Sequence, residues 1–117
     1  MKTILIVEDI ELNIDLLIQI LEDDYNLLVA RDGAQGVALA EQYRPALVLM
    51  DFSLPVMDGY EATRAIRRTF RSLPIIGLSA HAMSGDADKA RAAGCTDYLT
   101  KPMDEDLLLE KLKEYLG

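Results

Sequence analysis

The sequence predicts an α/β fold with one doubly wound, five-stranded parallel sheet and helices on both faces. Short apolar runs alternate five times with segments that suit helices, and this alternation is typical of parallel sheets with right-handed crossovers. The apolar runs are rich in Val, Ile and Leu without polar alternation, which indicates strands covered on both sides. With 117 residues, half of them hydrophobic, we expect one domain over residues 1–117.

The first part of the chain contains two strand–helix units. We expect strands over Thr3–Val7 and Leu27–Ala30, because both are short runs dominated by large aliphatic residues. Helices are expected over Glu11–Asp23 and Ala34–Tyr43. Asp32 is a suitable N-cap residue for the second helix, since its carboxylate can accept a hydrogen bond from a free amide group there.

The middle part continues the same alternation. We expect a strand over Ala46–Met50, a helix over Gly59–Thr69 and a further strand over Ile75–Leu78. A proline directly precedes each of these strands and cannot continue the helix before it. Asp58 occupies the N-cap position of the helix and marks its first turn.

The last part completes the pattern with two helices and a strand. We expect a short helix over Gly85–Ala93, rich in alanine and charge, with Ser84 as its N-cap residue. A strand over Asp97–Thr100 follows, and the chain closes with a helix over Glu105–Leu116 that Asp104 can cap. Periodicity alone does not give the order of the strands in the sheet.

The first helix is apolar on two sides. One face should belong to the core and contains Ile10, Ile14, Leu17, Ile18 and Leu21. The opposite side repeats an aliphatic residue every fourth position, at Leu12, Leu16 and Ile20. Flanking side chains could cover this second stripe, or it could dock another helical protein. We favour docking, because full burial of a helix is difficult in one small domain.

Composition excludes several classes of function. The net charge of −8 has the wrong sign for a nucleic-acid-binding protein, which normally shows a basic patch. No stretch approaches the about 18 apolar residues of a membrane span, and acids end the N-terminal apolar run far short of a signal sequence. The single cysteine, Cys95, cannot form an internal disulfide and fits a reducing compartment. We therefore expect a cytoplasmic protein without membrane insertion.

Polar residues follow the predicted strands at the points where the strands end. They are Glu8, Asp9, Asp51, Ser79 and Lys101. In open parallel sheets the ligand site lies outside the carboxyl ends of the strands, so these groups should converge. Each is ordinary on its own as a solvated acid, a strand-end hydroxyl or a surface lysine. Together they suit a divalent cation with oxygen ligands, Mg²⁺ or alternatively Mn²⁺, beside a phosphoryl group.

Asp51 is the expected centre of this chemistry. A carboxylate can act as a nucleophile toward phosphorus and form an aspartyl phosphate. A metal ion and the Lys101 ammonium would offset charge on the transferring group, and the Ser79 hydroxyl can donate to a phosphoryl oxygen.

Four stretches of the sequence match the pattern of one family. They are Ile4–Asp9, Leu49–Gly59, Leu78–Met83 and Gly94–Pro102. In content, order and spacing they resemble the receiver domains of two-component response regulators. The Leu-Ser-Ala-His-Ala-Met run is similar to that of hybrid histidine kinase receivers and of free-standing, single-domain cell-cycle regulators. The resemblance extends over essentially the whole chain.

The resemblance implies a flavodoxin-like fold with strand order 2-1-3-4-5. It also implies that Asp51 is the phosphate acceptor, and that Asp9 and Asp51 bind Mg²⁺ together with the backbone carbonyl of Ser53. The resemblance also implies that Glu8 binds water molecules that are coordinated to the metal ion. Ser79 and the lysine at position 101 correspond to the two groups that contact the phosphoryl oxygens.

Further roles follow from the same resemblance. Tyr98 matches an aromatic switch residue that turns inward when Ser79 moves toward the phosphoryl group. The bond between Lys101 and Pro102 is cis in relatives, and Ser53 and His81 flank the route of the water that hydrolyses the acyl phosphate.

Such a domain implies particular partners. The phosphoryl donor is a phosphohistidine on a histidine kinase or phosphotransfer protein, and a downstream protein target reads the result. The domain is not an enzyme for other substrates, since it catalyses only its own phosphorylation and dephosphorylation. We expect a monomer or weak dimer.

Two other interpretations compete with a phosphorylated receiver. A small Mg²⁺-dependent phosphatase of the haloacid dehalogenase type would carry a second aspartate two residues after the nucleophile, where this chain has Ser53. A receiver-like module that no longer accepts phosphate would usually have lost an acid or the lysine, and this sequence keeps all of them. We favour the phosphorylated receiver.

Overall fold

The computed structural model describes residues 1–79 and 86–117, which contain five strands and five helices. The strands are β1 (Thr3–Val7), β2 (Asn26–Ala30), β3 (Leu47–Asp51), β4 (Ile75–Ser79) and β5 (Asp97–Thr100). The helices are α1 (Glu11–Leu21), α2 (Gly33–Tyr43), α3 (Gly59–Thr69), α4 (Asp86–Ala93) and α5 (Glu105–Leu116). All strand pairs are parallel and the order is β2-β1-β3-β4-β5, which confirms the fold expected from the resemblance.

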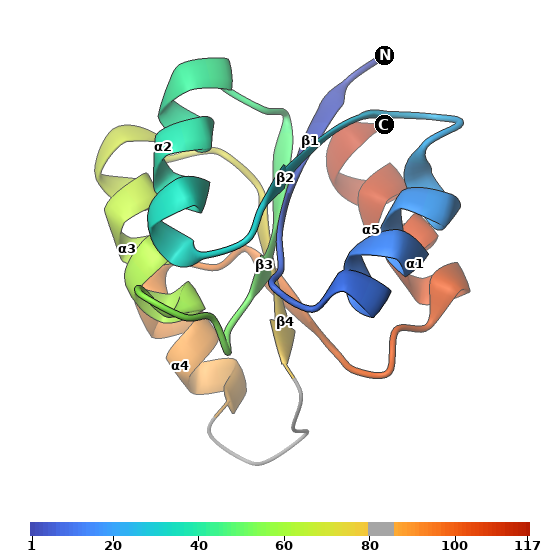
Figure 1. The fold of residues 1–117 in the computed structure, drawn as a ribbon. Helices are drawn as coiled ribbons and strands as arrows, with labels where there is room; N and C mark the ends of the chain where they lie inside the picture. Colours follow the sequence, from blue (N-terminus) through green and yellow to red (C-terminus); the bar gives the residue numbers. More distant parts are fainter. Residues whose placement is uncertain (80–85) are drawn as a thin grey trace.

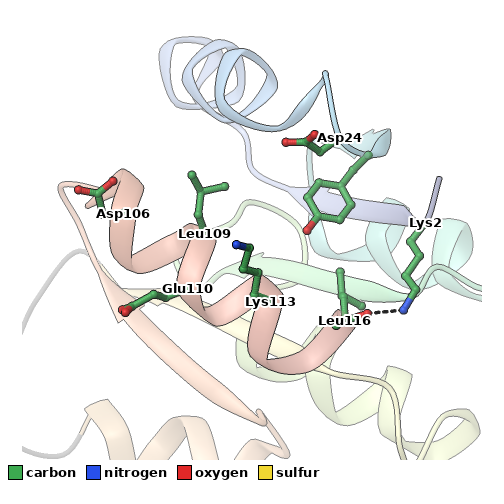
Figure 2. A pocket seen from close by; sticks show the side chains of 9 residues that line it. Lys2, Asp24, Asp106, Leu109, Glu110, Lys113 and Leu116 are labelled. Carbon is green, nitrogen blue, oxygen red and sulfur yellow. Dashed lines mark hydrogen bonds between the residues drawn. The ribbon is translucent and has the colours of Figure 1, made fainter.

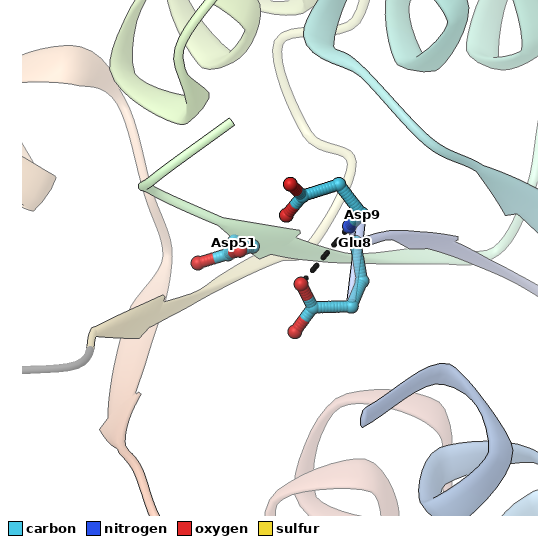
Figure 3. Close-up of side chains that lie close together, drawn as sticks. All are labelled: Glu8, Asp9 and Asp51. Atoms are coloured by element: carbon cyan, nitrogen blue, oxygen red, sulfur yellow. Dashed lines mark hydrogen bonds between the residues drawn. The ribbon is translucent and has the colours of Figure 1, made fainter. Parts of the chain in front are cut away.

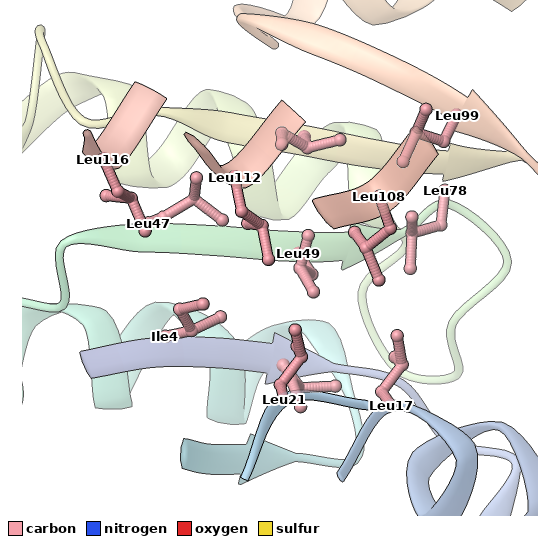
Figure 4. Close-up of a cluster of buried hydrophobic side chains, with 12 residues drawn as sticks. Ile4, Leu17, Leu21, Leu47, Leu49, Leu78, Leu99, Leu108, Leu112 and Leu116 are labelled. Carbon is pink, nitrogen blue, oxygen red and sulfur yellow. The ribbon is translucent and has the colours of Figure 1, made fainter. Parts of the chain in front are cut away.

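The sheet lies between two helical layers, with α1 and α5 on one face and α2, α3 and α4 on the other (Figure 1). On the first face, aliphatic side chains of the sheet interlock with the two helices, as Leu49, Leu108 and Leu112 do in Figure 4. Fully burying one such side chain contributes about 1.5–3 kcal/mol. Tight packing on both faces fixes the positions of the carboxyl ends of the strands, which all lie on the same side of the sheet because the strands are parallel.

The element bounds agree closely with the predictions. β1, β5, α3 and α5 coincide with the expected ranges, and the carboxylates of Asp32, Asp58 and Asp104 each cap a helix by accepting a backbone N–H. β3 begins and ends one residue later than the expected Ala46–Met50, and Asp51 stays in the ladder opposite Leu78. The expected cap and start of the fourth helix at positions 84 and 85 lie outside the described residues.

Helix α1 differs from its predicted form in length and in its apolar faces. It ends at Leu21, where the chain turns into β2, rather than at position 23. The prediction that Ile10 belongs to the core is wrong: it is 51% exposed. Its extended backbone precedes the helix, so its side chain leaves the buried face.

The second apolar stripe of α1 is divided between core and surface. Leu12 and Leu16 are 77% and 44% exposed, as a docking surface requires. Ile20 is partly buried and packs against the core beside α5. Only the part of the stripe near the carboxyl ends of the strands is therefore available to a partner. Among the described residues, no helix combines the length and apolar character needed to cross a bilayer.

Candidate functional site

Three carboxylates meet where β1 and β3 end. Glu8, Asp9 and Asp51 each offer an oxygen that lies within 4.8 Å of the others (Figure 3). Glu8 and Asp51 are almost fully buried, at 0% and 2% exposure, whereas Asp9 is exposed. The two strands are neighbours in the sheet, which is why residues 43 positions apart converge as the sequence predicted.

Lys101 reaches the same site from the loop after β5. Its Nζ donates to Glu8 Oε1 at 2.8 Å and lies 3.4 Å from Asp51 Oδ1. The peptide bond between Lys101 and Pro102 is cis, which confirms the expectation from the resemblance. The other oxygen of Glu8 accepts from the backbone N–H groups of Asp9 and Ile10 at 3.0 and 3.3 Å. The buried Glu8 carboxylate is therefore held from both sides.

The site changes the ionisation of its acids. Burial, followed by the hydrogen bond and charge of Glu8, raises the pKa of Asp51 from 3.8 to about 6. Burial also opposes ionisation of Glu8, but hydrogen bonds with Asp51 and Lys101 outweigh it and lower the pKa of Glu8. Of the two neighbouring buried carboxylates, Asp51 is therefore the one whose ionised form is disfavoured. A divalent cation relieves such repulsion, and a set of oxygen donors suits Mg²⁺.

Ser53 follows Asp51 by two residues, and Ser79 lies on the neighbouring strand β4, one residue after the partner of Asp51. The backbone N–H of Ser53 donates to Asp51 Oδ1 at 3.2 Å. Ser79 ends β4 and is 4% exposed. Its carbonyl accepts the N–H of Lys101 at 2.7 Å, so the backbone of the hydroxyl residue is joined to that of the lysine. Their roles toward a metal or a phosphoryl group stay predictions.

Tyr98 lies further from the acids. It is partly buried on β5, opposite Gly77 of β4, and packs against the cluster on the α2–α3–α4 side. It therefore neighbours the strand that carries Ser79, as a switch residue would need to. His81, for which the resemblance implied a place beside the water route, lies outside the described residues.

Sequence reasoning missed the packing around Phe52, the residue after Asp51. The tip of the Phe52 ring lies directly over Gly77 of β4, and a Cβ at Gly77 would stand 1.9 Å from Phe52 Cζ. A glycine within an otherwise aliphatic strand was the available signal, because it often marks close approach of another group.

The described residues line a small recess beside the acidic cluster and a larger cleft away from it. A small recess of about 80 Å³ joins Glu8 and Lys101 to the apolar side chains of Leu16, Pro102 and Met103. A larger cleft of about 880 Å³ lies at the opposite end of the sheet, where α5 faces the start of β1 and β2 (Figure 2). Lysines and acids both line the larger cleft, and the Lys2 ammonium there donates to the carbonyl of Leu116. Only the small recess is lined by residues of the strand-end site, Glu8 and Lys101.

Comparison with known proteins places the chain in a family. The response regulator receiver domain matches residues 4–113. This chain is a member of that receiver family. It is 38% identical over 119 residues to the polar-differentiation response regulator DivK of Brucella anthropi, covering 99% of this chain and 97% of the relative.

Solved receivers share the fold closely. The receiver domain of the sensor histidine kinase PA1611 from Pseudomonas aeruginosa PAO1 is 40% identical, with a TM-score of 0.92 and coverage of 99% and 98%. That structure has a magnesium ion in its active-site cleft. A chain from the complex of Saccharomyces cerevisiae Ypd1 with the receiver domain of Ssk1 is 31% identical, with a TM-score of 0.92 and coverage of 97% and 88%.

These findings establish the class of function. The chain is a receiver domain of two-component signalling, and its acidic site is compatible with Mg²⁺ and with phosphorylation. Receiver domains interact with histidine kinases or phosphotransfer proteins. The match over nearly the whole chain favours this function over a metabolite phosphatase.

Proposed function

We propose that this receiver is a phosphorelay switch that takes a phosphoryl group from a phosphohistidine onto Asp51. The observation that carries the proposal is the convergence of Asp51 with Glu8, Asp9 and Lys101 at one edge of the sheet. A buried acid crowded by a second acid and approached by an ammonium suits transfer of a charged group.

In the proposed reaction, an oxygen of the Asp51 carboxylate attacks phosphorus as the phosphorus–nitrogen bond of the donor breaks. The electron pair of that bond leaves with the imidazole, and an aspartyl phosphate forms. Lys101 and the Ser79 hydroxyl contact phosphoryl oxygens. Asp9, Asp51 and the carbonyl of Ser53 would hold Mg²⁺ or Mn²⁺, with Glu8 binding its waters, and the metal would offset charge on the transferring group.

The receiver would act on no other substrate. Water later attacks the acyl phosphate, breaks the bond between Asp51 and phosphorus and releases inorganic phosphate. Ser53 lies beside this route in our proposal and affects the lifetime of the phosphoryl group. The protein thereby catalyses its own phosphorylation and dephosphorylation alone.

We propose that the output is a change of surface. Ser79 moves toward the phosphoryl group, and Tyr98 turns inward on the neighbouring strand. Almost complete conversion between two states needs about 5.5 kcal/mol of differential stabilisation, and charge-assisted contacts from Lys101 and Ser79 contribute to it. A downstream protein target reads the new surface in the cytoplasm, and the receiver acts as a monomer or weak dimer.

The donor docks on the exposed end of α1 in our proposal. Ile10, Leu12 and Leu16 present apolar surface there, and Leu16 lines the recess that reaches Glu8 and Lys101. A histidine ring can approach Asp51 only if its protein covers the rim of the site. The similar yeast receiver was co-crystallised with the histidine phosphotransfer signaling protein Ypd1, which supports a phosphotransfer protein as the partner.

A Leu16→Arg variant tests the docking surface. Transfer from purified histidine phosphotransfer proteins should slow by about tenfold or more, since a charge replaces apolar contact area. Phosphorylation by acetyl phosphate should stay unchanged, because that donor needs no docking surface. Leu107→Arg is the matched control, at a leucine that is 40% exposed on α5. Equal transfer rates in both variants would remove α1 as the docking site.

The phosphorylation itself is tested by incubation with acetyl phosphate and Mg²⁺, followed by intact mass. We expect one phosphate adduct, absent from Asp51→Asn and after chelation. Asp24→Asn, at an exposed acid far from the site, should label normally. No adduct in the wild type, or an adduct that persists in Asp51→Asn, would refute the proposed acceptor.

A further inference from the structure

The residue after the acceptor is fixed on all sides. Phe52 is 6% exposed. Its N–H donates to the carbonyl of Leu78 on β4 at 3.2 Å, and its own carbonyl accepts the N–H of Gly59, the first residue of α3, at 3.1 Å. Both backbone groups of Phe52 therefore join the acceptor strand to its neighbours.

The ring of Phe52 has equally defined contacts. Its face stacks on Tyr60 of α3, with centroids 4.2 Å apart and planes inclined by 11°. Its tip lies against Gly77, where an added Cβ would meet Cζ at 1.9 Å and the two Cε atoms at 2.6 and 2.8 Å. The ring thus occupies space that only glycine leaves open on β4, and stacking of this kind adds about 0.5–1.5 kcal/mol beyond burial.

Phe52 lies between Asp51 and Ser53 in the sequence, and the backbone amide of Ser53 orients the Asp51 carboxylate. Asp51 precedes Phe52, and the N–H that follows Phe52, that of Ser53, donates to Asp51 Oδ1. On the α3 side, a Cβ at Gly59 would stand 2.1 Å from the Asp51 carbonyl oxygen, so the helix start also abuts the acceptor backbone. A displacement of the Phe52 ring would move both the carboxylate and the Ser53 amide.

We propose that Phe52 is a positioning residue for phosphoryl transfer: seated on Gly77 and stacked on Tyr60, it holds the segment from Asp51 to Ser53 in its reactive geometry. This inference rests on the proposed function of Asp51. Gly77 also lies two residues before Ser79 on β4, so the same contact joins the strand of the hydroxyl residue to the acceptor.

A matched pair of variants tests the proposal, because the chain has two phenylalanines. Phe52→Leu should lower the maximal rate of phosphorylation by acetyl phosphate by about tenfold to a hundredfold, as small misplacements of reacting groups do. Its half-saturating donor concentration should change little. Phe70, just after α3, is a partly buried ring packed against the same hydrophobic cluster. Phe70→Leu removes the same atoms there and should leave both parameters within about twofold.

A second measurement does not depend on transfer. Calorimetric titration with Mg²⁺ alone should show affinity weaker by about tenfold to a hundredfold in Phe52→Leu, the usual effect of disturbing groups behind metal ligands. Phe70→Leu should bind Mg²⁺ as the wild type does. Wild-type rates and affinity in folded Phe52→Leu, or an equal loss in both variants, would overturn the positioning role.

The Gly77→Ala variant separates positioning from stability. Alone it should unfold more easily, because the new methyl group collides with the Phe52 ring. Adding Phe52→Leu should restore stability while transfer stays slow, and recovery of the wild-type rate in that double variant would also overturn the proposal. If the wild type takes no phosphate, the proposed function fails. If it does and Phe52→Leu is equally fast, the positioning role alone fails.

Discussion

Replacement of Asp51 by asparagine should stabilise the metal-free receiver. The folded protein binds a proton at Asp51 more tightly than the unfolded chain does, because its pKa rises from 3.8 to about 6. This contribution to stability is present in acid and is lost as the pH rises through about 6. Each pKa unit corresponds to about 1.36 kcal/mol, so the ionised carboxylate costs about 3 kcal/mol at neutral pH.

Asparagine avoids that cost, since it carries no charge to bury or to repel Glu8. We expect Asp51→Asn to raise the free energy of unfolding by about 1–3 kcal/mol at about pH 8 in chelator. At about pH 4, where folded Asp51 is protonated, the gain should almost vanish. Added Mg²⁺ should stabilise the wild type more than the variant, because the metal neutralises the same repulsion.

Urea unfolding followed by far-ultraviolet circular dichroism measures these differences, and equal slopes confirm that only stability has changed. Asp24→Asn controls for loss of an acid at an exposed site. A variant that is less stable than the wild type at about pH 8, or an equal gain at both pH values, would show that Asp51 is not the strained acid of the site.

Three further predictions follow from the same geometry. Lys101→Met leaves the buried Glu8 carboxylate without its cation and should lower the free energy of unfolding by about 3–5 kcal/mol in chelator. Added Mg²⁺ should restore part of this loss in urea unfolding, and an unchanged urea midpoint in chelator would refute the pairing. Apparent Mg²⁺ affinity should fall about tenfold per pH unit below about 6, since Asp51 must lose its proton to bind, and a flat calorimetric profile would contradict this. Val56 has φ of 68° and is 85% exposed. Val56→Asn should therefore relieve backbone strain of about 1 kcal/mol and raise the melting temperature measured by calorimetry. A lowered melting temperature would show that the turn is unstrained.

The fold and the convergence of the acids were predictable because their signals are local. Glu8, Asp9 and Asp51 come directly after short aliphatic runs, and parallel strands place their carboxyl ends together. The helix caps were equally readable from single aspartates. Strand order was not, since periodicity carries no information about neighbours and only the family resemblance supplied it.

Other features depend on tertiary contacts that no local pattern encodes. The ion pair between Lys101 and Glu8 joins residues 93 positions apart, so the sequence showed both groups but not their pairing. The seat of Phe52 on Gly77 depends on the β3–β4 register. Ile10 has the spacing of a core residue but lies before the first turn of α1. The apolar periodicity of the sequence does not show where a helix begins, so it included this residue.

The pairing of Lys101 with Glu8 and Asp51 gives the resting receiver an internal counterion. A cation that enters the site therefore competes with the Lys101 ammonium group for the carboxylate oxygens of Glu8 and Asp51. In the proposed phosphorylation, loading is therefore an exchange, in which Lys101 would give up a carboxylate oxygen as it gains a phosphoryl oxygen. If Asp51 is phosphorylated as proposed, the cation that would meet the phosphoryl group is already within 3.4 Å of the Asp51 carboxylate.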